Sequence, residues 1–140
     1  MNRFKVLTIL SIFIMTASFP QQFTLAGAGA ESALSMPGQN LVCQTSGKAR
    51  ICASVSNSFP AQYSNVTVYG SLTVNGVAQA GKAMVTAWHY KTTTSQCAGT
   101  TNSKGLASCT RSISRATKDY AVRVTITING YSVATWFTPH

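Results

Sequence analysis

The chain has 140 residues, of which eleven are basic and two acidic, so its formal charge at pH 7 is +9. Charged residues make up only 9% of the chain. No Lys/Arg cluster or stacking-aromatic motif of a nucleic-acid-binding module occurs in the sequence, so we expect no nucleic-acid partner. Two acids are also too few for hydrolysis by paired carboxylates, because one of them, Glu31, lies in a polar stretch outside the expected domain.

Residues 1–30 have the three parts of a secretory signal peptide. Two basic residues lie among the first five, residues 6–19 are almost wholly apolar, and residues 25–30 are small, as a signal peptidase requires. The alternative is an uncleaved membrane anchor, but the apolar run is shorter than the ~20 residues that a spanning helix needs. We expect cleavage after Ala30, with Ala28 as the alternative, and an exported chain without a stable membrane span.

A single domain is expected to follow this signal. Residues 31–40 are small and polar and contain a Pro-Gly pair, which predicts a flexible lead-in. Residues 41–140 are enough for one domain that buries roughly two thirds of the surface of the unfolded chain. Arg3 and Lys5 belong to the expected signal, so nine of the eleven basic residues remain against two acidic ones, a formal charge of +7.

From Gly38 onwards the residues alternate with a period of two, with turn residues every eight to twelve positions. This pattern predicts an antiparallel all-β domain of about 7–8 strands. An even number of cysteines in a small exported domain also predicts a disulfide framework. The four are Cys43, Cys52, Cys97 and Cys109.

The first predicted hairpin spans residues 41–55. A two-residue turn that starts at Gly47 suits type II′ geometry, because glycine adopts the positive φ required at that position. Counting outward from this turn sets Cys43 opposite Cys52 at a non-hydrogen-bonded position. The Cα atoms of such a pair approach to about 4.5 Å, which a disulfide accepts. A Cys43–Cys52 disulfide is therefore predicted.

The next two strands differ in their patterns. Residues 65–74 have one apolar and one polar face, which predicts a half-buried strand with Gly70 as a candidate β-bulge. Its apolar row is Val66, Val68, Leu72 and Val74. Residues 82–92 are partly apolar on both faces, as in a central strand or one covered by a loop. The periodicity does not choose which face, that of Trp88 or that of His89, is buried.

The last predicted strand pair is joined at Asn129 and Gly130, a dipeptide that favours a tight hairpin turn. Residues 131–138 form its second strand. Tyr120, at the start of the first strand, is either the tyrosine of a tyrosine corner or an ordinary core residue. The inward row of the first strand is Tyr120, Val122, Val124, Ile126 and Ile128.

The stretch "CAGTTNSKGLASC" places a polar turn between the other two cysteines. A five-residue turn centred on Ser103 would pair Thr100 with Leu106 and bring Cys97 opposite Cys109. The spacing therefore predicts a cross-strand disulfide within a single hairpin.

Enzymatic and metal chemistry have little support in the sequence, so we expect neither an enzyme nor a cofactor. The cysteines are separated by eight and eleven residues, whereas zinc knuckles use two to four. A serine together with His89 and Asp119 would supply the residue types of a Ser-His-Asp catalytic triad, but the sequence has no nucleophile-elbow motif. Oxidised cysteines also leave no thiolate nucleophile.

Three stretches, "NGVAQAGKAMVTAWHY", "CAGTTNSKGLASCT" and "YAVRVTITINGYSVATWFTP", together resemble the bacterial immunoglobulin-like domains of the invasin and intimin type. The matching positions are Val85, residues 101–107, Tyr120, Val122 and Val124. The resemblance implies an immunoglobulin-like β-sandwich over residues 41–140. It further implies an extracellular, non-catalytic module for adhesion, spacing or display, and it transfers no site residue.

Function is therefore expected on exposed basic and aromatic surfaces of a secreted or cell-surface protein. The main hypothesis is a module that binds an extracellular protein or glycan. The alternatives are a cationic binder of anionic cell-wall or extracellular polymers and a small secreted inhibitor or effector. The candidate binding residues, of which the tryptophans are alternatively core residues, are Lys91, Arg111, Arg115, Lys118, Arg123, Trp88 and Trp136.

Overall fold

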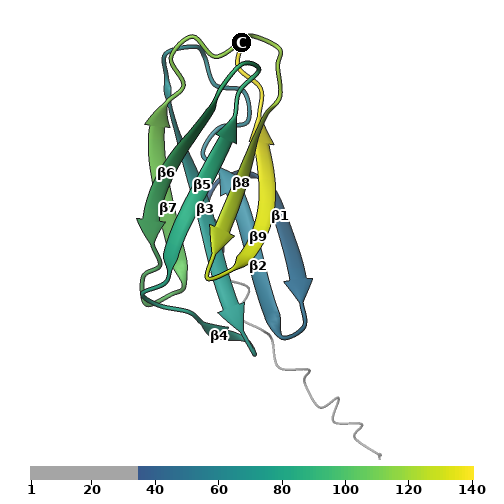
Figure 1. Cartoon of the computed structure of the whole chain (residues 1–140), viewed down its shortest axis with the longest axis vertical. Helices are drawn as coiled ribbons and strands as arrows, with labels where there is room; N and C mark the ends of the chain where they lie inside the picture. The colour runs from purple at the N-terminus through teal and green to yellow at the C-terminus, as the bar shows by residue number, and fades with distance from the viewer. Residues whose placement is uncertain (1–34) are drawn as a thin grey trace, which may run out of the picture. The chain divides into compact units, whose positions relative to one another are not determined.

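The computed structural model describes residues 35–140, where the chain forms nine strands and no helix (Figure 1). The expected signal peptide, residues 1–30, lies outside the described residues. The strands are β1 (Gln39–Ser46), β2 (Ala49–Val55), β3 (Asn65–Val74), β4 (Val77–Ala78), β5 (Ala83–His89), β6 (Thr94–Thr100), β7 (Leu106–Ser112), β8 (Val122–Ile128) and β9 (Tyr131–Phe137).

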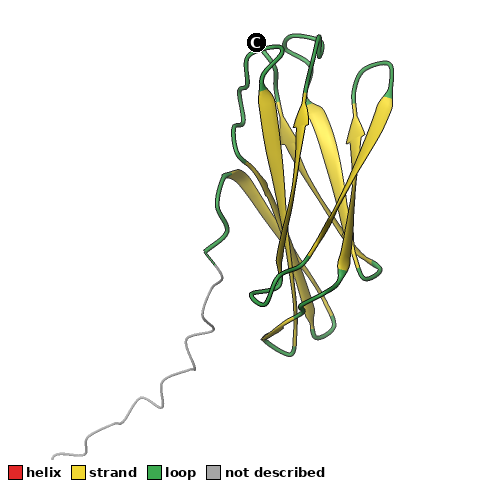
Figure 2. Cartoon of the chain, turned by 90° about the vertical axis from the view of Figure 1, so that its left-hand side faces the viewer, coloured by secondary structure: helices red, strands yellow, loops and turns green. Residues whose placement is uncertain are grey.

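Two antiparallel sheets pack face to face, which confirms the predicted all-β sandwich with two disulfides (Figure 2). The first sheet has the order β1-β2-β3-β7, and the short strand β4 lies beside the end of β3. The second sheet has the order β6-β5-β8-β9. The ninth strand, beyond the 7–8 expected, is accounted for by β4, which has only two residues.

β1 begins at Gln39, within residues 31–40, for which the sequence predicts a lead-in. The residues just before it already pack on the sheet. Ser54 Oγ donates a hydrogen bond to Pro37 O, and a Cβ on Gly38, whose φ is 102°, would lie 2.4 Å from Val55 O. Glycine at this position lets the chain approach the backbone of β2 closely.

Both predicted two-residue turns are confirmed. Gly47 has a φ of 59°, and Cys43 pairs with Cys52 at a Cα–Cα distance of 4.0 Å, joined by the expected disulfide. Asn129 and Gly130 have φ values of 49° and 84°, as a type I′ turn requires at both central positions. Turn chemistry therefore fixes the register of both hairpins.

The Cys97–Cys109 disulfide is also present, but the hairpin predicted around it is wrong. β6 pairs with β5 in the second sheet, whereas β7 pairs with β3 in the first. The connecting loop, residues 101–105, crosses between the sheets instead of reversing within one, and Thr101 Oγ1 fixes it by donating to Gln79 O at 2.6 Å. The disulfide thus joins the two sheets, with Cα atoms 6.2 Å apart.

The core lies between the sheets and contains the face of β5 that carries Met84, Thr86 and Trp88. Trp88 is fully buried and meets Phe137 edge to face, with ring centroids 5.6 Å apart. Its Nε1 donates to Thr86 Oγ1 at 2.8 Å, so the buried indole N–H is satisfied. The choice between the two faces of β5 is therefore made by packing across the sandwich.

Gly70 is not a bulge, because the register of β3 with both β2 and β7 continues through it without a shift. It lies in the inward row of β3 under the second sheet. A Cβ there would lie 2.8 Å from Met84 Sδ and 2.9 Å from Ile126 Cγ2. Glycine is required at this point because the sheets approach closely.

Replacing Gly70 by alanine should therefore destabilise the fold. Gly70→Ala forces the Met84 and Ile126 side chains to shift, and such overpacking costs about 1–3 kcal/mol. Urea denaturation should show a lower free energy of unfolding. An unchanged midpoint would contradict the close approach of the sheets at this residue.

Removing the inter-sheet disulfide should also destabilise the fold. Cys97→Ala/Cys109→Ala opens a loop of 12 residues, for which the chain-entropy model gives a loss of up to about 3 kcal/mol. Urea denaturation measures the loss, with Cys43→Ala/Cys52→Ala, which opens a loop of 9 residues within one sheet, as the comparison. Thiol titration of the unmodified protein in denaturant should find no free thiol, and two or more would refute the framework.

Candidate functional site

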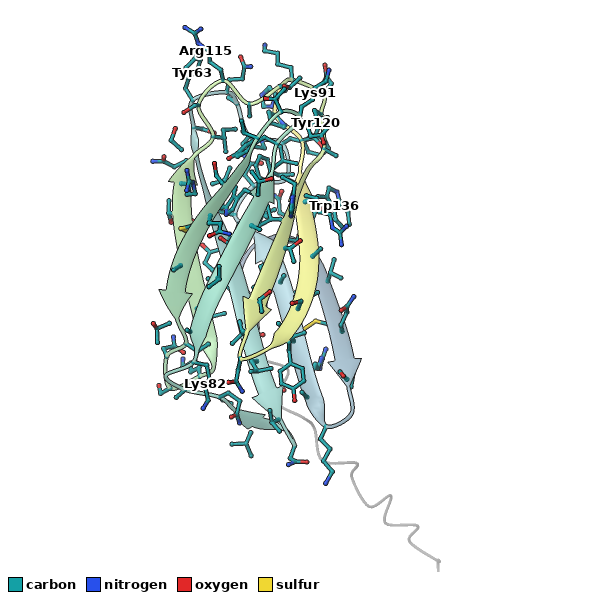
Figure 3. The ribbon with its side chains drawn as sticks, in the orientation of Figure 1. Tyr63, Lys82, Lys91, Arg115, Tyr120 and Trp136 are labelled. Atoms are coloured by element: carbon teal, nitrogen blue, oxygen red, sulfur yellow. A yellow bond between two sulfur atoms is a disulfide. The ribbon has the colours of Figure 1, made fainter. Side chains whose placement is uncertain are left out.

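Three loops and the C-terminal residues meet at one end of the sandwich, which we call the loop end. The loops are residues 56–64 between β2 and β3, residues 90–93 between β5 and β6, and residues 113–121 between β7 and β8. Figure 3 shows Tyr63, Lys91, Arg115 and Tyr120 at this end and Lys82 at the opposite one. Three of the predicted binding residues, Lys91, Arg115 and Lys118, lie in these loops.

Backbone hydrogen bonds tie the first loop, the third loop and the C-terminal segment to one another. Tyr63 N donates to Ser114 O at 2.7 Å and Ile113 N to Ser64 O at 3.0 Å, which joins the first loop to the third. The C-terminal segment is attached in the same way, since Asp119 N donates to Pro139 O at 2.8 Å. The first loop, the third loop and the C-terminal segment are therefore bonded to one another, which holds their backbone in place.

Tyr63 is the most unusual residue of the loop end. Its φ is 65°, a left-handed conformation that is unfavourable for a bulky residue. Its side chain is 62% exposed, and its hydroxyl accepts a hydrogen bond from Arg115 Nε at 2.7 Å. The ring is thus held out into solvent beside a cation by a strained backbone, and such strain clusters at functional sites.

Next to Arg115, the second and third loops enclose an open cavity of about 240 Å³. Its wall combines two cations with hydroxyl groups and the Tyr90 ring. Burial raises the pKa of Tyr90 above its ordinary value, an effect that the nearby Arg111 guanidinium partly opposes, so its hydroxyl is protonated at neutral pH. The lining residues are Tyr90, Lys91, Thr92, Thr93, Ser95, Ile113, Ser114, Arg115, Ala116 and Thr117.

One acidic side chain also lies in these loops. Asp119 follows Lys118 directly and is exposed, with a φ of 58°. Three cationic side chains therefore share the three loops with one carboxylate. The balance favours an anionic ligand, and the hydroxyl groups of the cavity supply neutral hydrogen-bond partners around its two cations.

The other predicted binding residues lie elsewhere. Arg111 is half-buried on β7 and donates a hydrogen bond from Nη1 to Gln96 O on β6, so it has a structural role between the sheets. Arg123 and Trp136 are register partners on the exposed face of the second sheet, where Trp136 is 46% exposed. Trp88 is fully buried, so its assignment to a binding surface is wrong, because the core needs its volume.

Sequence reasoning missed Tyr63 and the threonines of the cavity. Tyr63 lies within a proline-containing loop that has no periodic pattern. Nothing in the sequence indicates its positive φ or its contact with Arg115, which is 52 positions away. Tyr63 and the residues of the cavity come together only because the strand order brings their loops to the same end of the sandwich.

The structure does not assemble the catalytic arrangement considered from the sequence. His89 lies on the exposed face of β5, with Nε2 3.4 Å from Thr125 Oγ1, whereas Asp119 lies in the loop before β8. No hydrogen bond joins them among residues 35–140. In the same part of the chain, no group of three His, Cys, Asp or Glu side chains is placed to hold a metal ion.

No protein-family model matches the chain, and none of the curated proteins matches it. No helix in the described part of the chain is long and apolar enough to cross a membrane.

Relief of the strain at Tyr63 provides a test of the loop-end geometry. Asparagine tolerates a left-handed backbone better than tyrosine, so Tyr63→Asn should leave the free energy of unfolding unchanged or raise it by about 1 kcal/mol. Urea denaturation measures this. A clear loss of stability would mean that the Tyr63 ring contributes to the fold more than its backbone costs.

Proposed function

We propose that this chain is an exported, non-catalytic binding module with an immunoglobulin-like fold, which attaches through its loop end to anionic glycans of a cell wall or extracellular surface. The observation that carries the proposal is that Lys91 and Arg115 line one cavity, with Lys118 in the same loop as Arg115, beside the strained, exposed ring of Tyr63. Adhesion or display at the surface follows from such attachment.

The strand order supports the immunoglobulin-like assignment. In the first sheet, β2, β3 and β7 correspond to the neighbouring strands A, B and E of an immunoglobulin domain. In the second sheet, the order β6-β5-β8-β9 corresponds to C′-C-F-G. Each of these strands therefore has the same neighbours as in that fold. β1 is then an additional edge strand, and strand D is replaced by the crossing loop between β6 and β7. The resemblance to invasin-type and intimin-type domains remains part of the proposal.

Two features support export. All four cysteines of the described region are paired in disulfides, which form and persist in oxidising compartments. The sequence pattern of residues 1–30 is that of a secretory signal. A disulfide across the two sheets also suits a small domain that functions outside the cell.

The chemistry of the loop end suits an acidic sugar polymer better than a compact anion. Exposed charge pairs each contribute about 0.5 kcal/mol, so one cation gives little affinity, and a repeating polyanion can engage several together. The threonine and serine hydroxyls of the cavity provide partners for sugar hydroxyls. Binding of this kind weakens as salt screens the charges.

Retention on polygalacturonate should therefore fall steeply with salt, whereas neutral dextran should not retain the protein. The triple variant Lys91→Gln/Arg115→Gln/Lys118→Gln should weaken retention at low salt about tenfold, if each charge contributes about 0.5 kcal/mol. Elution against a sodium chloride gradient and equilibrium binding measure both effects.

A matched control separates the loop end from overall charge. Lys48→Gln/Arg50→Gln/Lys104→Gln removes two lysines and one arginine, all exposed, from the opposite end of the sandwich. This variant should bind almost as well as the unmodified protein. Equal losses in the two triple variants would show a general charge effect and overturn the loop-end site, and salt-independent retention would overturn electrostatic attachment altogether.

A further inference from the structure

The two sheets meet along two boundaries, and one of them is open over part of its length. Along β6 and β7 the inter-sheet disulfide and the bond from Arg111 join the edges. Along β1 and β9, Asn40 Nδ2 donates to Trp136 O and Thr135 Oγ1 donates to Asn40 O, both at 2.7 Å. Toward the opposite end, no hydrogen bond joins β1 to β9 among residues 35–140.

The backbone of β9 has unused hydrogen-bonding groups along this open stretch. The two-residue turn before Tyr131 makes Ile128 and Tyr131 a hydrogen-bonded pair, and such pairs alternate with non-hydrogen-bonded ones along the ladder. The N–H and C=O groups of Ser132 and Ala134 therefore point away from β8. No backbone hydrogen bond in the described part of the chain uses them. These two N–H and two C=O groups therefore point outward with the spacing that an adjacent antiparallel strand would bond to.

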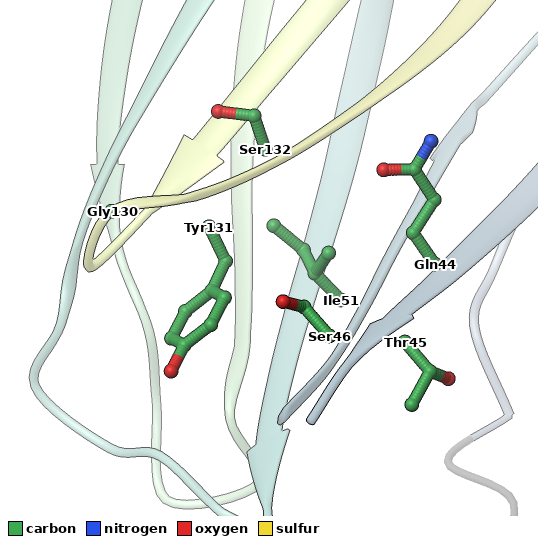
Figure 4. Close-up of a pocket in the computed structure, with 7 residues that line it drawn as sticks. All are labelled: Gln44, Thr45, Ser46, Ile51, Gly130, Tyr131 and Ser132. Atoms are coloured by element: carbon green, nitrogen blue, oxygen red, sulfur yellow. The ribbon is translucent and has the colours of Figure 1, made fainter. Parts of the chain in front are cut away.

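A cavity of about 380 Å³ lies between β1 and β9 at the Ser132 end of this stretch. Figure 4 shows Tyr131 and Ser132 on one side, Gln44 and Ser46 on the other, and Ile51 between them. Ile51 belongs to the buried core, with 3% of its surface exposed, so the cavity reaches the apolar layer between the sheets. No lysine, arginine, aspartate or glutamate lines it.

β9 also lacks the devices that usually protect an edge strand. Its sequence, YSVATWF, contains no charged residue and no proline, and its register with β8 has no bulge. An unprotected edge of this kind is a template for pairing with another extended segment. A second extended backbone presents the alternating donors and acceptors that these four groups require.

We propose that the open edge of β9 is a docking site for an extended, uncharged segment of a partner protein, which adds to the second sheet as a strand through Ser132 and Ala134. The alternation of the added strand places every second side chain toward the cavity, where an apolar side chain would reach Ile51. The uncharged lining selects against Lys, Arg, Asp or Glu at that position. This site is separate from the loop end and does not depend on it.

Hydrogen exchange tests the edge in the unmodified protein, with the acetylated and amidated peptide Val-Thr-Ile-Thr-Ile as the probe. This peptide repeats residues 124–128, which already pair with β9 on its other edge. The Ser132 and Ala134 amides should exchange rapidly in the free protein and become at least tenfold slower with saturating peptide. The Val133 and Thr135 amides, which face β8, should be slow in both states and serve as the internal reference.

Three variants distinguish backbone pairing from general adhesion of the peptide. Ala134→Pro removes one outward N–H and no ladder hydrogen bond, so the peptide should no longer protect the Ser132 amide. Ala134→Thr keeps the N–H and should bind normally. Ser46→Phe fills the cavity with the β9 backbone intact and should weaken binding at least tenfold, which keeps the test valid if the proline variant unfolds.

Several results would overturn the proposal. Slow exchange of Ser132 and Ala134 in the dilute free protein would mean that the edge is already covered. Protection that grows with protein concentration in the absence of peptide would identify a second copy of the chain as the occupant. Peptide binding that is unchanged in both Ala134→Pro and Ser46→Phe would place the peptide elsewhere.

Discussion

The crossing of the chain between β6 and β7 is the constraint on which the rest of the structure depends. At this point the disulfide between Cys97 and Cys109 fastens one sheet to the other. Thr86 supports the crossing from within, because its hydroxyl donates to Cys97 O at 3.0 Å and accepts from the Trp88 indole. Thr86 therefore links the Trp88 side chain in the core to the backbone of β6 at Cys97, which carries the inter-sheet disulfide.

That crossing also determines which surfaces come together. Because β7 returns to the first sheet, the loop that follows it lies beside the β2–β3 loop, and Tyr63 can bond to Ser114 and Arg115. The loop end and its cationic cavity are thus consequences of strand order rather than of any local motif.

The two boundaries between the sheets are closed by different means and have different consequences. A covalent bond closes the boundary at β6 and β7, whereas side chains of Asn40 and Thr135 close only part of the boundary at β1 and β9. Within residues 35–140, the part that remains open leaves the outward backbone groups of Ser132 and Ala134 unbonded and contains the cavity lined by Ile51. The proposed partner strand would add at the open part without unfolding of the sandwich.

Local chemistry made several parts of the fold predictable. Alternation of apolar residues predicted the buried rows of β3 and β8, and the Gly47 and Asn129–Gly130 turns predicted two registers. The Cys97–Cys109 pairing was also predicted, although for the wrong reason, since a spacing of 12 suits either a hairpin or a bond between sheets. Of the candidate binding residues, three lie together at the loop end, and Trp88 is in the core.

The sequence by itself determined the β class, the strand periods, the two-residue turns and the presence of a disulfide framework, because each depends on residues close together in the chain or on composition. Tertiary structure alone decided which face of β5 is buried, why residue 70 must be glycine, and which sheet each strand joins. It also decided the grouping of Tyr63 with Arg115 and the open edge at Ser132 and Ala134. These features depend on contacts between distant segments, and no local pattern records which distant segments will meet.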